Sequence, residues 1–372
     1  MKENWLENLE SNLPNFLSKL TKQEHTYQAV IEGNTIEGKN LNLGLSCYAL
    51  KIFYITNLWD KLDKEKQKKW IDYINSFQSN SNNFPDNSYI DTKYLEYFSK
   101  LNPSKWIKNF TKKMLNKYTN QNFLLDDLKL ENFIRAETKQ AISTLHQVNE
   151  KNKKPYNMFP KTEKEVFNYL ENLDWSKPWN AGAQYAALCV FVSTQISSKD
   201  EKEKLINILE EFILTITQED TGTFYKGSKP SDVEIVNGAM KVITGLDWID
   251  VKIPYPENLL KTFLRIDPND DGCDLVDIVY VIYMCQKSIN YKEEEIKLFC
   301  KNILNKIENH YFYNEGGFSY FINKSQTHYY GVKITKGLNE PDLHGTLLLV
   351  WAISMIAEII DIPIKNWKVL KP

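Results

Sequence analysis

Residues 344–356 read HGTLLLVWAISMI, a stretch of helical length that is small or apolar on nearly every side. Two other stretches have the same character, NLGLSCYALKIFYI at 42–55 and NAGAQYAALCVFV at 180–192. A helix that is apolar all round must be surrounded by other parts of the protein. These segments are therefore predicted to be inner helices, and their small residues allow such helices to approach closely.

A second kind of helix alternates with the first along the chain. KEKQKKWIDYINSF at 64–77 and TEKEVFNYLENL at 162–173 have an apolar stripe and a broad charged face, which is typical of outer helices. The alternation of outer and inner helices occurs six times, and no stretch keeps the period-two pattern of a strand. The predicted helices lie at about 3–20, 41–59, 62–77, 104–118, 131–148, 161–173, 179–195, 199–217, 231–247, 256–265, 274–287, 291–310 and 341–361.

Six outer–inner hairpins predict an all-α fold, the (α/α)6 toroid, in which six parallel inner helices form a ring inside the outer ones. An open solenoid is the competing arrangement. We favour closure because both ends of a solenoid need polar capping faces, whereas the last inner helix is among the most apolar in the chain. No domain boundary is visible, so residues 1–372 are predicted to form a single toroid domain.

The overall composition excludes several classes of protein. The 372 residues include 46 basic and 48 acidic side chains, and the net charge of −2 argues against a general nucleic-acid or anionic-membrane binder. The first residues, MKENWLENLESN, lack the layout of a signal peptide, and no apolar run reaches the about 18 residues of a membrane span. These features predict a cytoplasmic protein without an integral membrane segment. Five cysteines without CxxC spacing argue against a disulfide framework and structural zinc.

The long connections are predicted to lead into the inner helices, so that all inner helices begin at one face beneath these loops. Loops on a rigid scaffold commonly carry binding sites, and helix N-termini favour an anionic or electron-rich ligand. Only two of the 46 basic residues are arginines, Arg135 and Arg265. Arg135, at the start of an inner helix, is predicted to hold an anion with its planar fork. The alternative is that each arginine pairs with a neighbouring carboxylate, such as Glu137 or Asp267.

Three segments resemble the α/α toroids of the prenyltransferase and squalene-cyclase type. QEDTGTF at 218–224 and NEGGFSY at 314–320 are similar to the Gln…Gly-aromatic repeats of these proteins, and DLHGT at 342–346 resembles the Asp…His-Thr opening of the last inner helix in protein prenyltransferase β subunits. The resemblance implies isoprenoid cyclisation or transfer, or carbohydrate chemistry on a similar barrel. The position of the family's zinc-binding cysteine falls on Val279, so neither a metal nor another cofactor is predicted.

The candidate site residues lie mostly at the starts of inner helices. Asp342 and His344 are either an acid/base pair or a helix cap beside a core histidine. The acidic segment 267–277 is a calcium loop that lacks its twelfth ligand, a turn with capping aspartates, or a source of acid/base groups. The candidate catalytic residues are Asp277, Asp342, His344 and Glu137. The candidate substrate-binding residues are Arg135, Trp175, Trp179, Asn180, Tyr185, Asn237, Asp274, Tyr280, Tyr329 and Tyr330.

These residues lead to two kinds of functional prediction. The first is an enzyme with an aromatic pocket at the inner-helix N-termini that acts on an isoprenoid-like or anionic small molecule, with a carbohydrate-active lyase, hydrolase or epimerase as the alternative. The second is a toroid without catalytic activity that binds a glycan, peptide or protein partner. An enzyme is expected to bring two or more of the catalytic candidates to one wall, whereas a binding module is expected to use them as caps and salt bridges.

Overall fold

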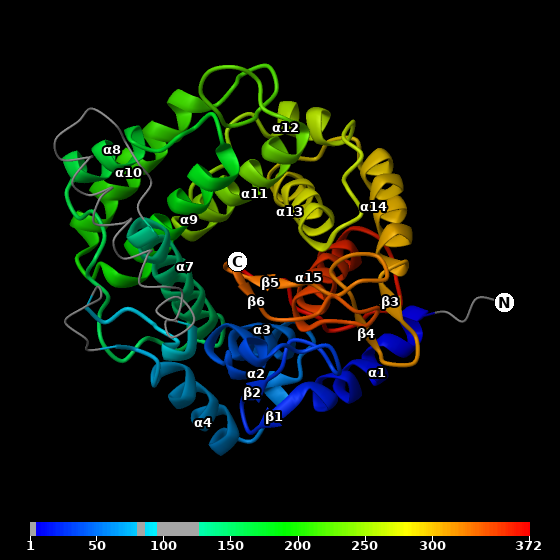
Figure 1. The fold of residues 1–372 in the computed structure, drawn as a ribbon. Helices are drawn as coiled ribbons and strands as arrows, with labels where there is room; N and C mark the ends of the chain where they lie inside the picture. The colour runs from blue at the N-terminus through cyan, green and yellow to red at the C-terminus, as the bar shows by residue number, and fades with distance from the viewer. Residues whose placement is uncertain (1–4, 80–85, 95–125) are drawn as a thin grey trace.

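The computed structural model describes residues 5–79, 86–94 and 126–372, and within them an inner ring of six helices is the central feature. Each helix of the ring packs against the next, and the last packs against the first, so the ring is closed (Figure 1). Its members in ring order are α3 (Leu43–Ile55), α7 (Asp126–Gln147), α9 (Pro178–Gln195), α11 (Asp232–Trp248), α13 (Gly272–Ser288) and α15 (Leu343–Ile359).

The outer helices surround this ring and alternate with the inner ones along the chain (Figure 1). The predicted all-α (α/α)6 toroid is confirmed, and the open solenoid is wrong because α15 packs against α3. The helix predicted at 104–118 lies outside the described residues. The outer helices are α1 (Trp5–Leu20), α4 (Lys64–Asn75), α8 (Glu163–Glu171), α10 (Lys199–Ile216), α12 (Pro256–Phe263) and α14 (Glu293–Glu308).

The inner helices run parallel, as contacts at both ends of the ring show. At the beginnings of α9 and α11, the backbone N–H of Trp179 donates to Glu234 Oε2 at 3.1 Å. At the far ends of α13 and α15, the hydroxyl of Tyr283 donates to Glu358 Oε2 at 2.6 Å. The inner helices therefore begin at one face of the ring, which we call the amino-end face.

Small residues permit the tight packing of α9 against α11. A Cβ atom on Gly245 would lie 2.5 Å from the ring of Tyr185, and one on Gly238 would lie 2.6 Å from Pro178. Both distances are shorter than side-chain contacts allow, so these positions require glycine. The expectation that small residues bring inner helices close together is confirmed at this interface.

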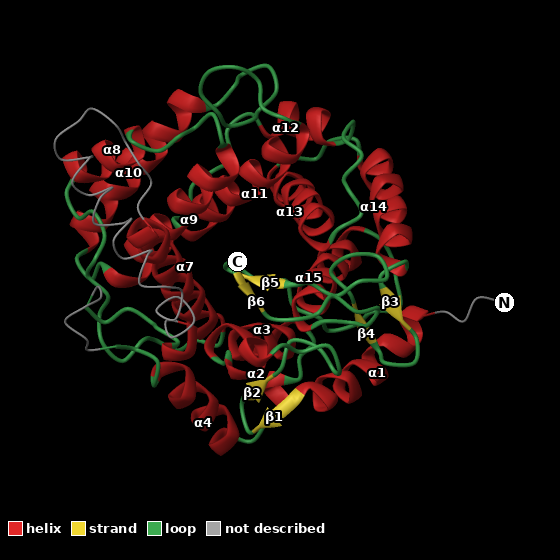
Figure 2. Ribbon diagram, viewed as in Figure 1, coloured by secondary structure: helices red, strands yellow, loops and turns green. Residues whose placement is uncertain are grey.

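The connections into α3 and α15 are long and carry all the described short strands, which the sequence patterns did not reveal (Figure 2). The predicted rule of long connections into inner helices does not hold throughout, because residues 148–162 lead out of α7 whereas only 172–177 lead into α9. A short 3-10 helix also lies in the connection out of α3. Strands of two or three residues are too short to show a period-two pattern. Three antiparallel hairpins pair β1 with β2, β3 with β4 and β5 with β6. These short elements are β1 (Thr21–Gln23), β2 (Thr26–Tyr27), α2 (Ile36–Asn40), the 3-10 helix η1 (Trp59–Lys61), β3 (Tyr311–Phe312), β4 (Gly317–Phe318), β5 (His328–Tyr329) and β6 (Val332–Lys333).

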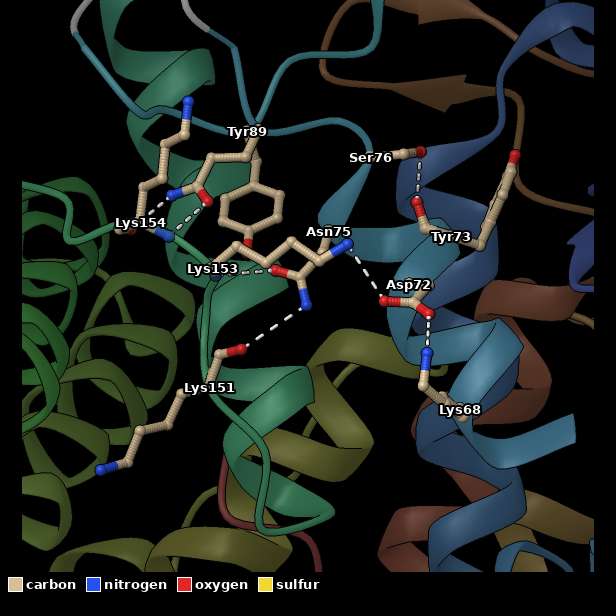
Figure 3. A network of polar contacts seen from close by, with 10 residues as sticks. Lys68, Asp72, Tyr73, Asn75, Ser76, Tyr89, Lys151, Lys153 and Lys154 are labelled. Atoms are coloured by element: carbon tan, nitrogen blue, oxygen red, sulfur yellow. Dashed lines mark hydrogen bonds and ion pairs between the residues drawn. The ribbon is translucent and has the colours of Figure 1, made fainter. Parts of the chain in front are cut away.

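A polar network joins α4 to the chain segment that follows α7 (Figure 3). Asn75 Oδ1 accepts hydrogen bonds from the hydroxyl of Tyr89 at 2.6 Å and from the backbone N–H of Lys153 at 3.2 Å. The ammonium of Lys153 also lies 3.0 Å from Asp72 Oδ1. Because Asn75 and Tyr89 are buried, these bonds satisfy groups that water cannot reach. The network therefore fixes this part of the outer layer.

Candidate functional site

The amino ends of the inner helices are occupied largely by side chains of the protein itself. Asp91 Oδ2 accepts the backbone N–H groups of Asn42 and Leu43 at the start of α3, at 2.7 and 3.1 Å. Asp271 caps α13 in the same manner, and Ser231 caps α11. Buried helix ends need such partners for their free N–H groups. The prediction that free N–H groups at the helix starts bind an anionic ligand is therefore wrong for these helices.

Asp342 braces the start of α15 with both of its carboxylate oxygens. Oδ1 accepts the N–H of Gly345 at 2.7 Å, and Oδ2 accepts the N–H of Tyr320 at 2.7 Å and that of Gln326 at 3.0 Å. Burial raises the pKa of Asp342 to about 6, while these hydrogen bonds act in the opposite direction. The carboxylate joins the helix to the loop before it, so the cap that the sequence offered as an alternative is present.

His344 lies between two tyrosine rings, two residues after this cap. Its ring stacks on Tyr48, with centroids 4.6 Å apart and planes inclined by 6°, and on Tyr320 at 5.5 Å. Its Nδ1 lies 2.5 Å from Gln326 Oε1, so Nδ1 carries the proton. Burial, together with the nearby charges of Lys241 and Lys51, lowers the pKa of His344 to about 3. His344 is therefore a neutral, oriented imidazole.

Glu137 on α7 pairs with Tyr329 on β5. The tyrosine hydroxyl donates to Glu137 Oε1 at 2.7 Å, and both residues are buried. Gly44 makes room for this hydroxyl, since a Cβ there would lie 2.0 Å from it. Burial raises the pKa of Glu137 to about 8, although the bond from Tyr329 lowers it. Glu137 is therefore largely protonated at neutral pH and has a hydrogen-bonded partner from a loop.

The turn after Tyr329 places a second tyrosine against α7. Tyr330 and Gly331 form the two-residue turn between β5 and β6, with φ values of 42° and 83°. This conformation suits glycine but is unusual for tyrosine, so the surroundings must hold Tyr330 in place. Its ring lies 5.6 Å from that of Phe133, and its carbonyl accepts the hydroxyl of Tyr94 at 2.7 Å. The turn thus fixes two tyrosines close to Glu137.

The raised pKa of Glu137 predicts a measurable dependence of stability on pH. Between its ordinary pKa of 4.5 and about 8, the folded state keeps a proton that the unfolded state releases, so stability falls as pH rises. The Glu137→Gln variant has no carboxyl group to titrate, so its stability should not fall in this way as pH rises. Its amide oxygen can still accept the hydrogen bond from Tyr329. We expect the variant to gain on the order of a few kcal/mol over wild type between pH 5 and pH 8. Urea unfolding at several pH values measures this difference, and the exposed Glu203→Gln variant is the control. A parallel pH dependence of Glu137→Gln and wild type contradicts the prediction.

Asp277 on α13 has a carboxylate that the fold does not use fully. The residue is 2% exposed, and among the described residues its Oδ2 has no hydrogen-bond partner. The ammonium of Lys241 on α11 lies 3.7 Å from Oδ2, which is an ion-pair distance but too long for a hydrogen bond. Burial raises the pKa of Asp277 to about 7, and Lys241 opposes this shift. A buried carboxylate with an unused oxygen is a candidate for proton transfer.

Asp274, one turn earlier on α13, is held by two amides. Its Oδ1 accepts Asn237 Nδ2 at 2.9 Å, and its Oδ2 accepts Asn269 Nδ2 at 2.7 Å. Asp267 and Asp270 each lie 2.9 Å from the ammonium of Lys306. These aspartates are thus used in contacts within the protein, and no group of three His, Cys, Asp or Glu residues in the described part of the chain is arranged to bind a metal ion.

Three lysines inside the ring were missed by the sequence patterns used above. Lys51, Lys139 and Lys241 lie in the middle of α3, α7 and α11, and Lys51 is only 7% exposed. The signal was present for Lys51 and Lys241, each an isolated charge between apolar neighbours on an inner helix, whereas Lys139 lies among polar and charged residues. Burial lowers the pKa of Lys51 to about 8 and that of Lys139 well below its ordinary value, and Lys241 lowers both further.

Arg135 makes contacts that neither of its predicted roles anticipated. Its Nη2 donates to Asn132 Oδ1 at 2.7 Å and to Gln184 Oε1 at 2.9 Å. Both partners are neutral amides, so Arg135 is not paired with Glu137. The bond to Gln184 links α7 to α9.

The other predicted binding residues on α9 and nearby are spread between the surface and the core. Trp175 is buried against Phe212 of the outer layer, with ring centroids 5.7 Å apart. Trp179 and Asn180 are exposed at the start of α9. Tyr185 is fully buried where α9 meets α11. Trp175 therefore belongs to the packing between outer helices rather than to a wall of the ring interior.

Tyr280 and Asn237 are also buried. Tyr280 packs on Trp351 across α13 and α15, with centroids 5.3 Å apart. Asn237 lies nearer the amino-end face, where it bonds Asp274. The structure therefore pairs Glu137 with Tyr329 and leaves one oxygen of Asp277 unused on the opposite side of the ring, whereas Trp175 and Tyr280 serve packing.

Comparison with known proteins shows similarity in fold only. No protein family and no curated protein sequence matches the chain. None of the described helices is long and apolar enough to cross a membrane. Among solved structures, the chain is similar to the GH76A α-1,6-mannanase from Salegentibacter sp. HEL1_6, with 11% identity and a TM-score of 0.43 over 96% of this chain and 100% of the other. It is also similar to a polysaccharide lyase, with 11% identity and a TM-score of 0.45 over 96% and 98% of the two chains. These names give no support to the resemblance to prenyltransferases and squalene cyclases.

Proposed function

We propose that this protein is an acid/base enzyme that acts on a sugar-derived small molecule in the interior of the inner ring, near its amino-end face. The observation that carries the proposal is the carboxylate of Asp277. It is buried, it has an oxygen without a hydrogen-bond partner among the described residues, and it lies 3.7 Å from Lys241. Leaving a buried polar atom unsatisfied destabilises the fold, so its retention is typical of a functional group.

Two carboxyl groups on opposite sides of the ring have the protonation states that acid/base chemistry needs. With a pKa near 7, Asp277 is partly ionised at neutral pH and is proposed to accept a proton. With a pKa near 8, Glu137 remains protonated and is proposed to donate one, held in place by Tyr329. His344 is neutral, and its Nε2 is left to contact the ligand because Nδ1 bonds Gln326. Asp342 is proposed only as the brace of α15.

The polar character of the surroundings favours a sugar over an isoprenoid. An isoprenoid chain needs a largely hydrocarbon wall, whereas this region contains the amides of Gln140 and Gln326 and three lysines. The half-buried ring of Tyr330 is proposed to supply a flat apolar surface on which a sugar ring stacks. We therefore propose a carbohydrate as the substrate. The experiment below includes a prenyl diphosphate, which tests the isoprenoid alternative.

A substrate panel tests the proposal directly. Purified protein is incubated with uronate-containing, sulfated and neutral polysaccharides and oligosaccharides, and with a prenyl diphosphate. New reducing ends report hydrolysis, ultraviolet absorbance of an unsaturated sugar reports elimination, and NMR reports epimerisation. We expect turnover of a carbohydrate and none of the prenyl diphosphate. Turnover of the prenyl diphosphate alone, or of no member of a broad panel, overturns the proposal.

One observation favours a second candidate, a toroid that binds a glycan, peptide or protein without catalysis. Asp342 and Asp274 are used in caps and amide bonds, as expected for a binding module. Saturable binding of a glycan or peptide without any conversion would support this function over the first. Asp277 distinguishes the two, because a binding module gains nothing from a buried carboxyl group that titrates near neutral pH.

A further inference from the structure

Of the three lysines inside the ring, Lys51 and Lys139 lie on the neighbouring helices α3 and α7, whereas Lys241 lies across the ring on α11. Lys51 lies on α3 and Lys241 on α11, and two inner helices separate these on either side of the ring (Figure 1). The positive charge of Lys241 nevertheless lowers the pKa values of both Lys51 and Lys139, and the charges of Lys51 and Lys241 both act on His344. Lys51 is 7% exposed on its inner helix, and the ammonium of Lys241 lies 3.7 Å from the buried carboxylate of Asp277, so both side chains lie within the ring, where these charges act on one another.

We infer that Lys51, Lys139 and Lys241 form a binding site for an oxyanion of the ligand, a carboxylate, sulfate or phosphate group on a sugar. The inference rests on the proposed function, since it assigns the anionic group to the substrate of that site. The three lysines, rather than Arg135, are then the groups that hold the anion, because the guanidinium of Arg135 already bonds two amides.

The charges around the three lysines are not balanced within the described part of the chain. The ammonium groups of Lys51 and Lys139 form no hydrogen bond or ion pair with any described residue, and only that of Lys241 has a carboxylate nearby, that of Asp277 at 3.7 Å. Glu137 is largely protonated at neutral pH, and His344 is neutral. The carboxylate of Asp342 is directed to backbone N–H groups. An excess of positive charge therefore remains in the ring interior.

Such an arrangement opposes folding unless a ligand compensates for it. A buried ammonium without a partner is unfavourable because it has lost its hydration. An oxyanion among the lysines would provide charge-assisted hydrogen bonds to each of them. The side chain of Lys241 is 26% exposed, so the site is open to water and to a ligand. Lysine ammonium groups act as point charges that approach an oxyanion from separate directions, in contrast to the planar fork of arginine.

Direct binding measurements test the site without reliance on turnover. Isothermal titration calorimetry is carried out with glucuronate, glucose 6-sulfate and glucose 6-phosphate, with methyl glucoside as the neutral counterpart and inorganic sulfate as the free anion. We expect saturable binding of at least one anionic sugar, weakened by salt, and no binding of methyl glucoside. The three sugars distinguish the source of the oxyanion. Equal binding of neutral and anionic sugars, or none of any anion, overturns the inference.

Substitution of the lysines assigns the binding to this cluster. Lys51→Met and Lys139→Met should each weaken the anionic sugar about tenfold to a hundredfold, as expected for one charge-assisted hydrogen bond. Lys51→Met should also raise the melting temperature without ligand, because Lys51 is 7% exposed and its ammonium has no partner among the described residues. The exposed Lys204→Met on α10 is the matched control and should change neither quantity. Variants that bind the anion as wild type does, or that melt at a lower temperature, show that the lysines are structural and overturn the inference.

The two proposals fail in different ways. Suppose that wild type turns over a neutral sugar, that Asp277→Asn loses this activity, and that wild type binds no anion. This result overturns the lysine site and supports the proposed enzyme. Anion binding that Lys51→Met and Lys139→Met lose, together with no turnover by wild type, supports the lysine site and overturns the enzyme.

Discussion

Asp277→Asn should lower turnover by about a hundredfold to ten-thousandfold while the protein remains folded, since this is the usual contribution of a general acid or base. The amide has nearly the shape of the carboxylate but cannot accept the proton. Because the native carboxyl group is buried and has an unused oxygen, its replacement by a neutral amide should change the free energy of unfolding little. The measurement is kcat/KM on the substrate found in the panel, with the melting temperature of each variant.

The pH profile makes this expectation more specific. The base Asp277, with a pKa near 7, gives a rate that rises with pH up to about 7, and the acid Glu137, with a pKa near 8, makes the rate fall above about pH 8. The rising limb should be absent from the residual activity of Asp277→Asn. Asp267→Asn is the matched control, because Asp267 lies in the loop before the same helix, and its side chain is 86% exposed. An Asp277→Asn variant with activity within a few-fold of wild type would remove Asp277 from the reaction.

Asp342→Ala should cause a large loss of stability, because one carboxylate holds a helix and a loop together. The substitution removes the acceptor of three backbone N–H groups, those of Gly345, Tyr320 and Gln326. Since Asp342 is 1% exposed, water cannot easily replace it, and each unsatisfied buried donor costs about 1–3 kcal/mol. We expect a total loss of about 3 kcal/mol or more, measured by thermal and urea unfolding.

The control for Asp342 is a cap of the ordinary exposed kind. Asp63 caps α4 through one hydrogen bond to the N–H of Lys66 at 2.8 Å, so Asp63→Ala should lose only about 1 kcal/mol. The stability of Asp342→Asn should lie between those of wild type and Asp342→Ala. Its amide oxygen can still accept hydrogen bonds, but its NH2 group faces backbone N–H donors and cannot bond them. If Asp342→Ala melts as wild type does but loses turnover, Asp342 is catalytic and the brace is a minor role.

Much of the fold could be predicted because buried positions recur along a helix and can be recognised in the sequence as a repeated pattern of apolar residues. The stretch 344–356 is apolar on nearly all sides, and α15 is correspondingly enclosed by α3, α13 and α14. The amphipathic stretch 64–77 became the outer helix α4, whose apolar side faces the ring. The short strands β5 and β6 were not predictable, because two residues carry no periodic signal and depend on the surrounding contacts.

The site was harder to predict because the role of a polar residue depends on its partners. Asp342 and Asp277 look alike in the sequence, each at or near the start of an inner helix, yet one is bonded to three backbone N–H groups and the other keeps an oxygen free. Arg135 stood out by its rarity, but Gln184 and Asn132 occupy its guanidinium. Lys51 could be recognised only as a charge between apolar neighbours, whereas its burial, the main cause of its lowered pKa, is set by the closure of the ring.

The sequence by itself determined the alternation of buried and half-buried helices, and with it the class of the fold, because the hydrophobic effect acts on every residue of a helix face and leaves a repeated pattern. Only the tertiary structure decided which charges are compensated and which remain available. Hydrogen bonds and ion pairs join single atoms over about 3 Å, so their partners are set by ring closure, which brings the middles of α3, α7 and α11 around a common interior.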